Sequence, residues 1–315
     1  MKSVILAALA ALLLTVTAIW AFESEEHEIY ILQCVEQIAD IPDFSCGDGE
    51  VVPVTVNGQP VTYDTFQAGL DCDRPALLSN GHGSDGQCVP GSRILNLSTE
   101  TAQISAMCRQ KHNRPTDEFA YDEIDIIAHN PSTGATCWFQ AKADDPDAPI
   151  DGTQVVSPTN PAAPAIWADP DALVTDGCGN CHDNDPFMYS PFVGQVWDEV
   201  PANPLGPYYH VGAEFGFDQW PTKTFDLRDN TCLGCHRIGR QTTCDTLTDW
   251  MIGATVPEGA DPLAQQYPLS HAMPPEHGLT RAAWSTFHST SVADIKSCCE
   301  NPDQQMCALT ELPKY

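Results

Sequence analysis

Basic residues are scarce in this chain of 315 residues. Lys and Arg total 14 against 43 Asp and Glu, which gives a formal net charge of −29 at pH 7. A surface with so few cations does not neutralise a phosphate backbone, so the composition argues against nucleic acid as a partner. The negative field favours association with a basic redox partner or surface, and it fits adaptation to a salty habitat equally well.

Long apolar segments are also few. The stretch from Val4 to Leu14 follows Lys2 and precedes small residues at Ala18 and Ala21, which is the pattern of a secretory signal peptide. No later segment approaches the roughly 20 apolar residues that a membrane helix needs. We therefore expect residues 1–21 to be a cleaved signal peptide, no membrane span, and a product in the periplasm, at the cell surface or secreted.

Catalytic signatures are absent from the first half of the chain, which contains no nucleophile elbow, phosphate loop or metal-ligand cluster. Cysteine, in contrast, is plentiful, with 14 residues. Four of these cysteines occur in two copies of one pattern, Cys178-Gly179-Asn180-Cys181-His182 and Cys232-Leu233-Gly234-Cys235-His236.

Both copies are the C-x-x-C-H pattern of covalent haem c attachment. Two thiols form thioethers to the porphyrin, and the imidazole that follows binds the iron. The pattern predicts two haems c, bound by Cys178, Cys181, Cys232 and Cys235, with His182 and His236 as the proximal iron ligands.

A zinc half-site, a redox dithiol and a disulfide corner also use C-x-x-C. A zinc ribbon usually places its second pair about 15 to 20 residues on, whereas Cys181 and Cys232 are 51 positions apart. Neither zinc nor redox chemistry requires a histidine directly after both pairs, so the haem interpretation is favoured.

The other ten cysteines form two even sets. Six precede the first motif and four follow the second. We expect three disulfides in the first set and two in the second, as suits an oxidising compartment, with the connectivity open. Cys298 and Cys299 should bond to separate partners, because disulfide geometry is hard to reach between neighbours.

The expected fold class is α+β with much irregular structure. Prolines and aspartates crowd residues 144–171, which read as a linker or a surface loop. This segment would separate a disulfide-tied, mainly β domain at 22–143 from a compact di-haem domain with short helices at 172–315.

Periodicity predicts the elements of the first half. Glu28 to Asp40 has a helical apolar pattern at Ile29, Leu32, Val35 and Ile38. Strands are expected on both sides of Asn57-Gly58, where Gln59-Pro60 lengthens the turn. The expected strands are Val51 to Val56, Val61 to Phe66, Arg93 to Leu97, Ala102 to Met107, Ile124 to Ala128 and Ala135 to Ala141.

The second half predicts only short helices. These would follow each motif and cover Cys244 to Gly253, Thr280 to His288 and Ser291 to Cys299, with Thr280 as an N-cap. Because only 54 positions separate Cys178 from Cys232, both haems should share one domain and lie close together.

The distal ligand of the first haem is expected between the motifs. His210 lies midway, in an aromatic stretch, and is favoured over Met188 and His129. For His129, a hydrogen bond within its hairpin is the alternative role.

The second half resembles bacterial exported multihaem c-type cytochromes, on the two motifs and Met273-Pro274-Pro275. The resemblance implies covalent haem, a mostly irregular fold and electron transfer. Because Met273 lies in a segment like the Met-Pro-Pro loop of many small c-type cytochromes, it is favoured as the distal ligand of the second haem, with His271 and His277 as competitors.

The expected function is extracytoplasmic electron transfer, with redox proteins as partners and self-association into a haem chain as a further option. One alternative is an enzyme like the di-haem cytochrome c peroxidases, whose motifs lie much further apart than here. Another is a first half that binds a substrate or surface polymer, with the haem pair as its electron outlet.

Overall fold

The computed structural model describes residues 25–70, 72–74, 88–115, 117–163, 165–188, 190, 192–201, 205–234, 236–241, 243–244 and 281–315. The expected signal peptide and the ligand candidates Met273, His271 and His277 lie outside these residues. No described helix combines the length and the hydropathy that crossing a membrane requires.

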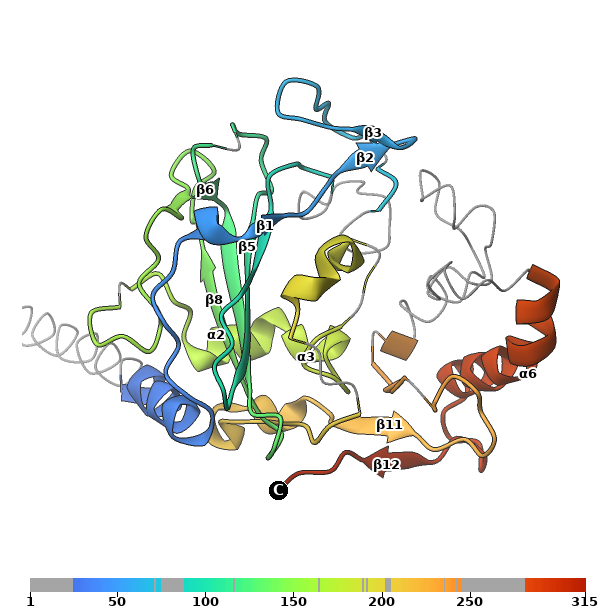
Figure 1. Cartoon of the computed structure of the whole chain (residues 1–315). Helices are drawn as coiled ribbons and strands as arrows, with labels where there is room; N and C mark the ends of the chain where they lie inside the picture. Colours follow the sequence, from blue (N-terminus) through green and yellow to red (C-terminus); the bar gives the residue numbers. More distant parts are fainter. Residues whose placement is uncertain are drawn as a thin grey trace, which may run out of the picture.

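A six-stranded sheet forms the centre of the molecule (Figure 1), with the strand order β1-β4-β5-β7-β8-β10. The first five strands are antiparallel, and β10 joins β8 in parallel. These strands are β1 (Glu50–Val51), β4 (Arg93–Asn96), β5 (Gln103–Arg109), β7 (Glu123–His129), β8 (Ala135–Lys142) and β10 (Tyr209–His210). The last strand therefore comes from the half of the chain that carries the motifs.

Four of the predicted strands are confirmed as β4, β5, β7 and β8. Their side chains alternate between two faces of the sheet, as the pleat requires. One face, which we call the inner face, carries Ile104, Ala106, Ile124, Ile126, Cys137 and Phe139, all buried in the largest core cluster. The opposite face, which we call the motif face, carries Glu123, Asp125, Ile127, His129, Thr136, Trp138 and Gln140.

The helix over residues 25–37 packs on the inner face. It buries Tyr30, Cys34 and Ile38, while Ile29 is 40% and Leu32 60% exposed. The predicted apolar stripe is thus confirmed at Ile38 but wrong at Ile29 and Leu32. The reason is that the Cys34–Cys137 disulfide and the Tyr30 hydroxyl, which accepts a hydrogen bond from the Trp138 N–H at 2.9 Å, fix the rotation of the helix.

The Asn57-Gly58 hairpin is shorter than predicted. Strands β2 (Thr55–Val56) and β3 (Gln59–Pro60) pair directly across a two-residue turn. Both turn residues have positive φ, 51° at Asn57 and 74° at Gly58, as the tightest hairpin turns require. The turn is therefore not lengthened, and Val61 to Phe66 forms turns instead of the expected strand.

Residues 144–171 run along the first half in irregular structure. They include β9 (Ile150–Asp151), which pairs with β6 (Ala120–Tyr121). Val155 bridges Phe44, and Trp167 bridges Ala141. A domain boundary in this segment stays a prediction.

The second half contains short helices and strands around irregular backbone. Between β8 and β10 come α2 (Pro170–Asp176), α3 (Cys178–Cys181) and η2 (Val193–Glu199). After β10 come η3 (Ala213–Phe215), η4 (Phe217–Gln219), β11 (Lys223–Phe225), α6 (Arg281–Glu300) and β12 (Leu309–Glu311), while η1 (Cys46–Asp48) precedes β1. Figure 1 shows α3 between the sheet and α6. The two predicted terminal helices are one continuous helix, α6. The described residues directly after His182 and His236 are irregular, whereas Thr243 and Cys244 have π-helical backbone where the predicted helix over Cys244 to Gly253 begins; Thr280 and residues 245–253 lie outside the described part.

Five disulfides join the described residues, and none crosses between the two cysteine sets. The first set pairs as Cys34–Cys137, Cys46–Cys108 and Cys72–Cys88, and the second as Cys244–Cys299 and Cys298–Cys307. The expected three and two bridges are confirmed, as are the separate partners of Cys298 and Cys299. Such a disulfide content indicates an extracytoplasmic, oxidising compartment.

Candidate haem attachment site

The first motif forms a single helical turn. Helix α2 ends at Gly177, whose φ of 75° is left-handed, and α3 starts directly after it. The turn closes with a hydrogen bond from the His182 N–H to the Cys178 carbonyl at 3.0 Å. The motif itself is therefore helical, and His182 lies at its C-cap, where its backbone leaves the helix.

The second motif closes in the same way. The His236 N–H donates to the Cys232 carbonyl at 2.9 Å, and the Asn230 side chain accepts from the Cys232 N–H at 3.0 Å. The two motifs have different residues between their cysteines, yet both contain a hydrogen bond from the histidine N–H to the carbonyl of the first cysteine. This bond fixes the position of the histidine backbone relative to that cysteine.

The motif cysteines are kept apart from the disulfides. Cys178, Cys181 and Cys232 form none of the five bridges, and Cys235 lies outside the described residues. Burial, with a smaller effect of the Asp125 carboxylate, raises the pKa of Cys178 to about 12. The Cys178 thiol is therefore protonated and resists oxidation at neutral pH.

Gly179 lets the first motif pack closely on the core. A Cβ at this position would lie 2.3 Å from Cγ of Trp220, which is 6% exposed. In the second motif a Cβ on Gly234 would meet only the Thr231 carbonyl oxygen, at 3.8 Å. Of these two glycines, Gly179 lies against an aromatic ring and Gly234 does not.

Trp138 brings His182 and His210 together at the motif face. Its ring centroid lies 4.9 Å from that of His182 and 5.9 Å from that of His210. Burial lowers the pKa of His182 to about 4 and that of His210 to about 3, so both rings are neutral at physiological pH. The structure thus gathers the predicted proximal and distal ligands of the first haem.

His129 is the third histidine of this region, and it is fully buried. Its ring lies 6.4 Å from that of Tyr208 and 6.2 Å from that of Phe187. Burial, with a smaller effect of Arg237, lowers the pKa of His129 to about 4. The alternative role predicted for it, a hydrogen bond within its hairpin, is confirmed by the 2.9 Å contact of Nδ1 with the Thr136 hydroxyl.

The chain segments that follow the two motif histidines contact each other. Arg237, directly after His236, forms an ion pair with Asp185 at 3.3 Å and donates to the Gly206 carbonyl. Gly239 lies so near Asp183 that a Cβ would be 1.9 Å from its Oδ2. The two motif turns are therefore neighbours in space.

Asp183 is part of the same contact. It is buried and accepts a hydrogen bond from the Thr243 hydroxyl at 2.8 Å. Burial raises the pKa of Asp183 to about 7, against the lowering effect of Thr243. Its hydrogen bonds fix the backbone after His182 to the backbone before Cys244.

The second motif is more open. His236 is exposed, whereas His182 is half-buried. The Thr231 hydroxyl, next to Cys232, lies 2.9 Å from Nδ1 of His288 in α6. His288 does not stand out in the sequence, because nothing in its local pattern shows that α6 packs beside the motif.

Of the other ligand candidates for the first haem, Met188 is half-buried and lies in irregular backbone. It directly follows Phe187, whose ring packs near His129.

The donor set of the first motif fits a haem c. Nδ1 of His182, Nε2 of His210 and Nε2 of His129 are buried and make no hydrogen bond. Buried polar atoms without a partner are rare and call for an explanation. Neutral imidazoles with a free ring nitrogen, beside two thiols kept out of disulfides, have the chemistry that covalent haem and its iron need.

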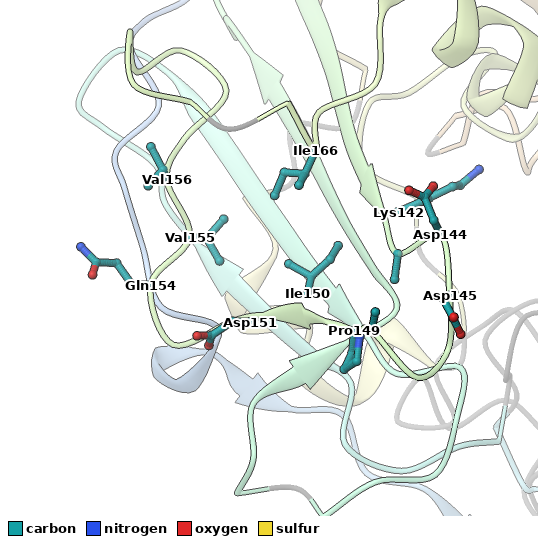
Figure 2. Close-up of a pocket in the computed structure, with 12 residues that line it drawn as sticks. Lys142, Asp144, Asp145, Pro149, Ile150, Asp151, Gln154, Val155, Val156 and Ile166 are labelled. Atoms are coloured by element: carbon teal, nitrogen blue, oxygen red, sulfur yellow. The ribbon is translucent and has the colours of Figure 1, made fainter.

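A surface pocket of about 430 Å³ lies elsewhere, along residues 142–166. Figure 2 shows Ile150, Val155 and Ile166 around a shared space, with Gln154 pointing away. None of its lining residues belongs to a motif, so this pocket is separate from the candidate haem site.

Comparison with known proteins gives no match: no family model, no curated protein and no solved structure is similar to this chain.

Proposed function

We propose that this protein transfers electrons outside the cytoplasm through two covalently attached haems c. Cys178, Cys181 and His182 would hold one haem, and Cys232, Cys235 and His236 the other. The haems supply one-electron chemistry at iron, with potentials that their axial ligands set.

One observation carries the proposal. Ten cysteines close five disulfides within their own sets, and the motif cysteines of the described part stay out of them. In an oxidising compartment, thiols that form no disulfide need another use. The shared turn of the two motifs supports the same chemistry at both.

The chain's own residues hold the two motifs next to each other. The Arg237–Asp185 ion pair and the packing of Gly239 on Asp183 join the segments behind His182 and His236. Both partners of the ion pair are mostly buried, at 7% and 18% side-chain exposure. A close haem pair would allow rapid internal electron transfer, and this proximity favours a conduit over two independent centres.

Electron transfer is favoured over peroxidase chemistry. A peroxidase needs an iron with an open coordination position, whereas the first motif has two further buried, neutral histidines near His182. The strong negative charge favours basic redox proteins as partners. We place the protein in the periplasm or at the cell surface, where it could also associate with copies of itself.

The test is the mass and the haem content of protein purified from a host that matures c-type cytochromes. The native protein should carry two added haems. Cys178→Ala/Cys181→Ala and Cys232→Ala/Cys235→Ala should each carry one.

The control Cys72→Ser/Cys88→Ser, which removes a disulfide outside the motifs, should retain two haems. A colourless native protein without added mass would overturn the proposal. Peroxide turnover with a reduced donor would favour the enzyme alternative.

A further inference from the structure

The sheet places two histidines in one row on the motif face. His129 of β7 and His210 of β10 are both register partners of Thr136, the β8 residue between them. Register partners on adjacent strands point to the same face. Both rings therefore face the region of the first motif, whereas the sequence favours His210 as ligand because it lies midway between the motifs in an aromatic stretch.

Hydrogen bonding sets the protonation of His129. The Thr136 hydroxyl has a single hydrogen, which it donates to the Gly134 carbonyl at 3.1 Å. At the 2.9 Å contact with His129, the Thr136 oxygen must therefore accept, and Nδ1 of His129 must donate. In a neutral imidazole whose Nδ1 carries the proton, Nε2 presents a lone pair, and here that lone pair is buried without a partner.

His210 has the opposite protonation. Nε1 of Trp138 donates to Nδ1 of His210 at 3.0 Å. An indole nitrogen only donates, so Nδ1 of His210 accepts and its proton resides on Nε2. A protonated Nε2 has no lone pair for a metal, and binding iron would require breaking the bond from Trp138.

The neighbours of His129 connect it to the segment that begins at His182. Tyr208, whose ring is near His129, donates its hydroxyl hydrogen to the His182 carbonyl. Phe187, the second aromatic residue near His129, lies five residues after His182 in the chain. His129 thus packs against the segment that the first motif histidine begins.

Resting on the proposed function, we infer that Nε2 of His129, and not His210, is the second axial ligand of the iron that His182 binds. Thr136 is then a positioning residue, because a metal-binding histidine usually donates its other ring N–H to an oxygen that fixes its tautomer. His210, held by Trp138, packs beside the ligands without binding iron.

The first experiment compares ferric spin states in the holoprotein by low-temperature magnetic resonance. His129→Ala should convert one of the two haems to high spin, with both haems still attached, and added imidazole should restore low spin. The matched variant His210→Ala should leave the spin state of both haems unchanged. Low-spin haems in His129→Ala, or a high-spin haem in His210→Ala, would overturn the assignment.

If His129→Ala does not fold, a second variant tests the same assignment. Thr136→Val keeps the size of the side chain but removes the acceptor of the His129 N–H, which makes the imidazole a weaker electron donor. The potential of one haem should rise while the other stays constant and both remain low spin. Unchanged potentials would overturn the assignment, whereas a native protein without haem would overturn the proposed function itself.

Discussion

At the scale of single residues, the Asp122 carboxylate accepts an unusually dense set of hydrogen bonds. Its carboxylate accepts two bonds of 2.7 Å from Arg114 and further bonds from the backbone N–H groups of Lys111 and His112. Burial acts to raise the pKa of Asp122, but these donors outweigh it and hold the pKa well below its usual range.

We predict that Asp122→Asn lowers the free energy of unfolding at neutral pH by about 3 kcal/mol, because it leaves Arg114 without its buried partner. The folded-state pKa is depressed, so the stabilisation is present above the unfolded-state pKa of about 4 and is lost as the pH falls below it. Because Asn does not titrate, the free energy of unfolding of the variant should fall less than that of the native protein as the pH is lowered. Urea unfolding of the holoprotein at several pH values measures both effects.

The control is Asp176→Asn, which removes the exposed ion pair with Lys142. Exposed pairs contribute less than about 1 kcal/mol. Equal destabilisation by the two variants at neutral pH would contradict the prediction.

The motif residues could be read from the sequence alone, whereas the difference between His129 and His210 could not. The roles of these two rings depend on Thr136 and Trp138, which the sheet register brings beside them. The Thr136 partner of His129 lies in the same hairpin and could be expected from the sequence, whereas Trp138 is 72 residues from His210 and no local pattern encodes that contact.

At the scale of elements, the two motif turns differ in what surrounds them. Helix α3 packs Gly179 on Trp220, while Gly234 of the second motif is open. We predict that Gly179→Ala lowers the free energy of unfolding by about 1–3 kcal/mol, because Trp220 and its packed neighbours must shift. Gly234→Ala is the matched control and should change it little.

Thermal unfolding of both holoprotein variants measures this difference. Neither glycine has a positive φ, so backbone strain does not explain a loss at either one. A Gly179→Ala protein as stable as Gly234→Ala would mean that Trp220 moves at little cost.

Strands were predicted better than the helix orientation. The two runs that flank the turn at residues 130–134 predicted β7 and β8 to within a residue at each end, because turn formers mark where a hairpin reverses. The helix over residues 25–37 was rotated, since its buried side is chosen by Cys34 and Tyr30, and not by Ile29 or Leu32. Turn chemistry at Asn57-Gly58 overrode the expected effect of Pro60.

At the scale of the whole molecule, the charge of −29 acts at long range. We predict that a cationic small-molecule reductant reduces the holoprotein faster than an anionic one of equal driving force at low ionic strength. The two rates should converge as salt is added, because screening shortens the reach of the field to about 8 Å at 0.15 M. Stopped-flow reduction measures both rates, and a ratio independent of salt would contradict the prediction.

The cysteine arithmetic predicted how many bridges each part of the chain would form, but not their connectivity. Counting shows that both sets are even, whereas choosing Cys34–Cys137 over its alternatives needs the helix placed on the inner face. The even number of cysteines in each set can be counted in the sequence, whereas the fold decides which cysteines lie close enough to bond.

The disulfide pattern also affects the order in which the cysteines can find their partners. In a chain that emerges from its N-terminus into an oxidising compartment, the first six cysteines arrive before Cys178 and find all their partners among themselves. By the time the motif thiols emerge, the wrong partners left to them are the other motif thiols and the four cysteines that come later. Vectorial emergence would therefore confine mispairing to the chain from Cys178 onward, and would leave an interval for cofactor insertion before Cys299 and Cys307 complete the final crosslinks.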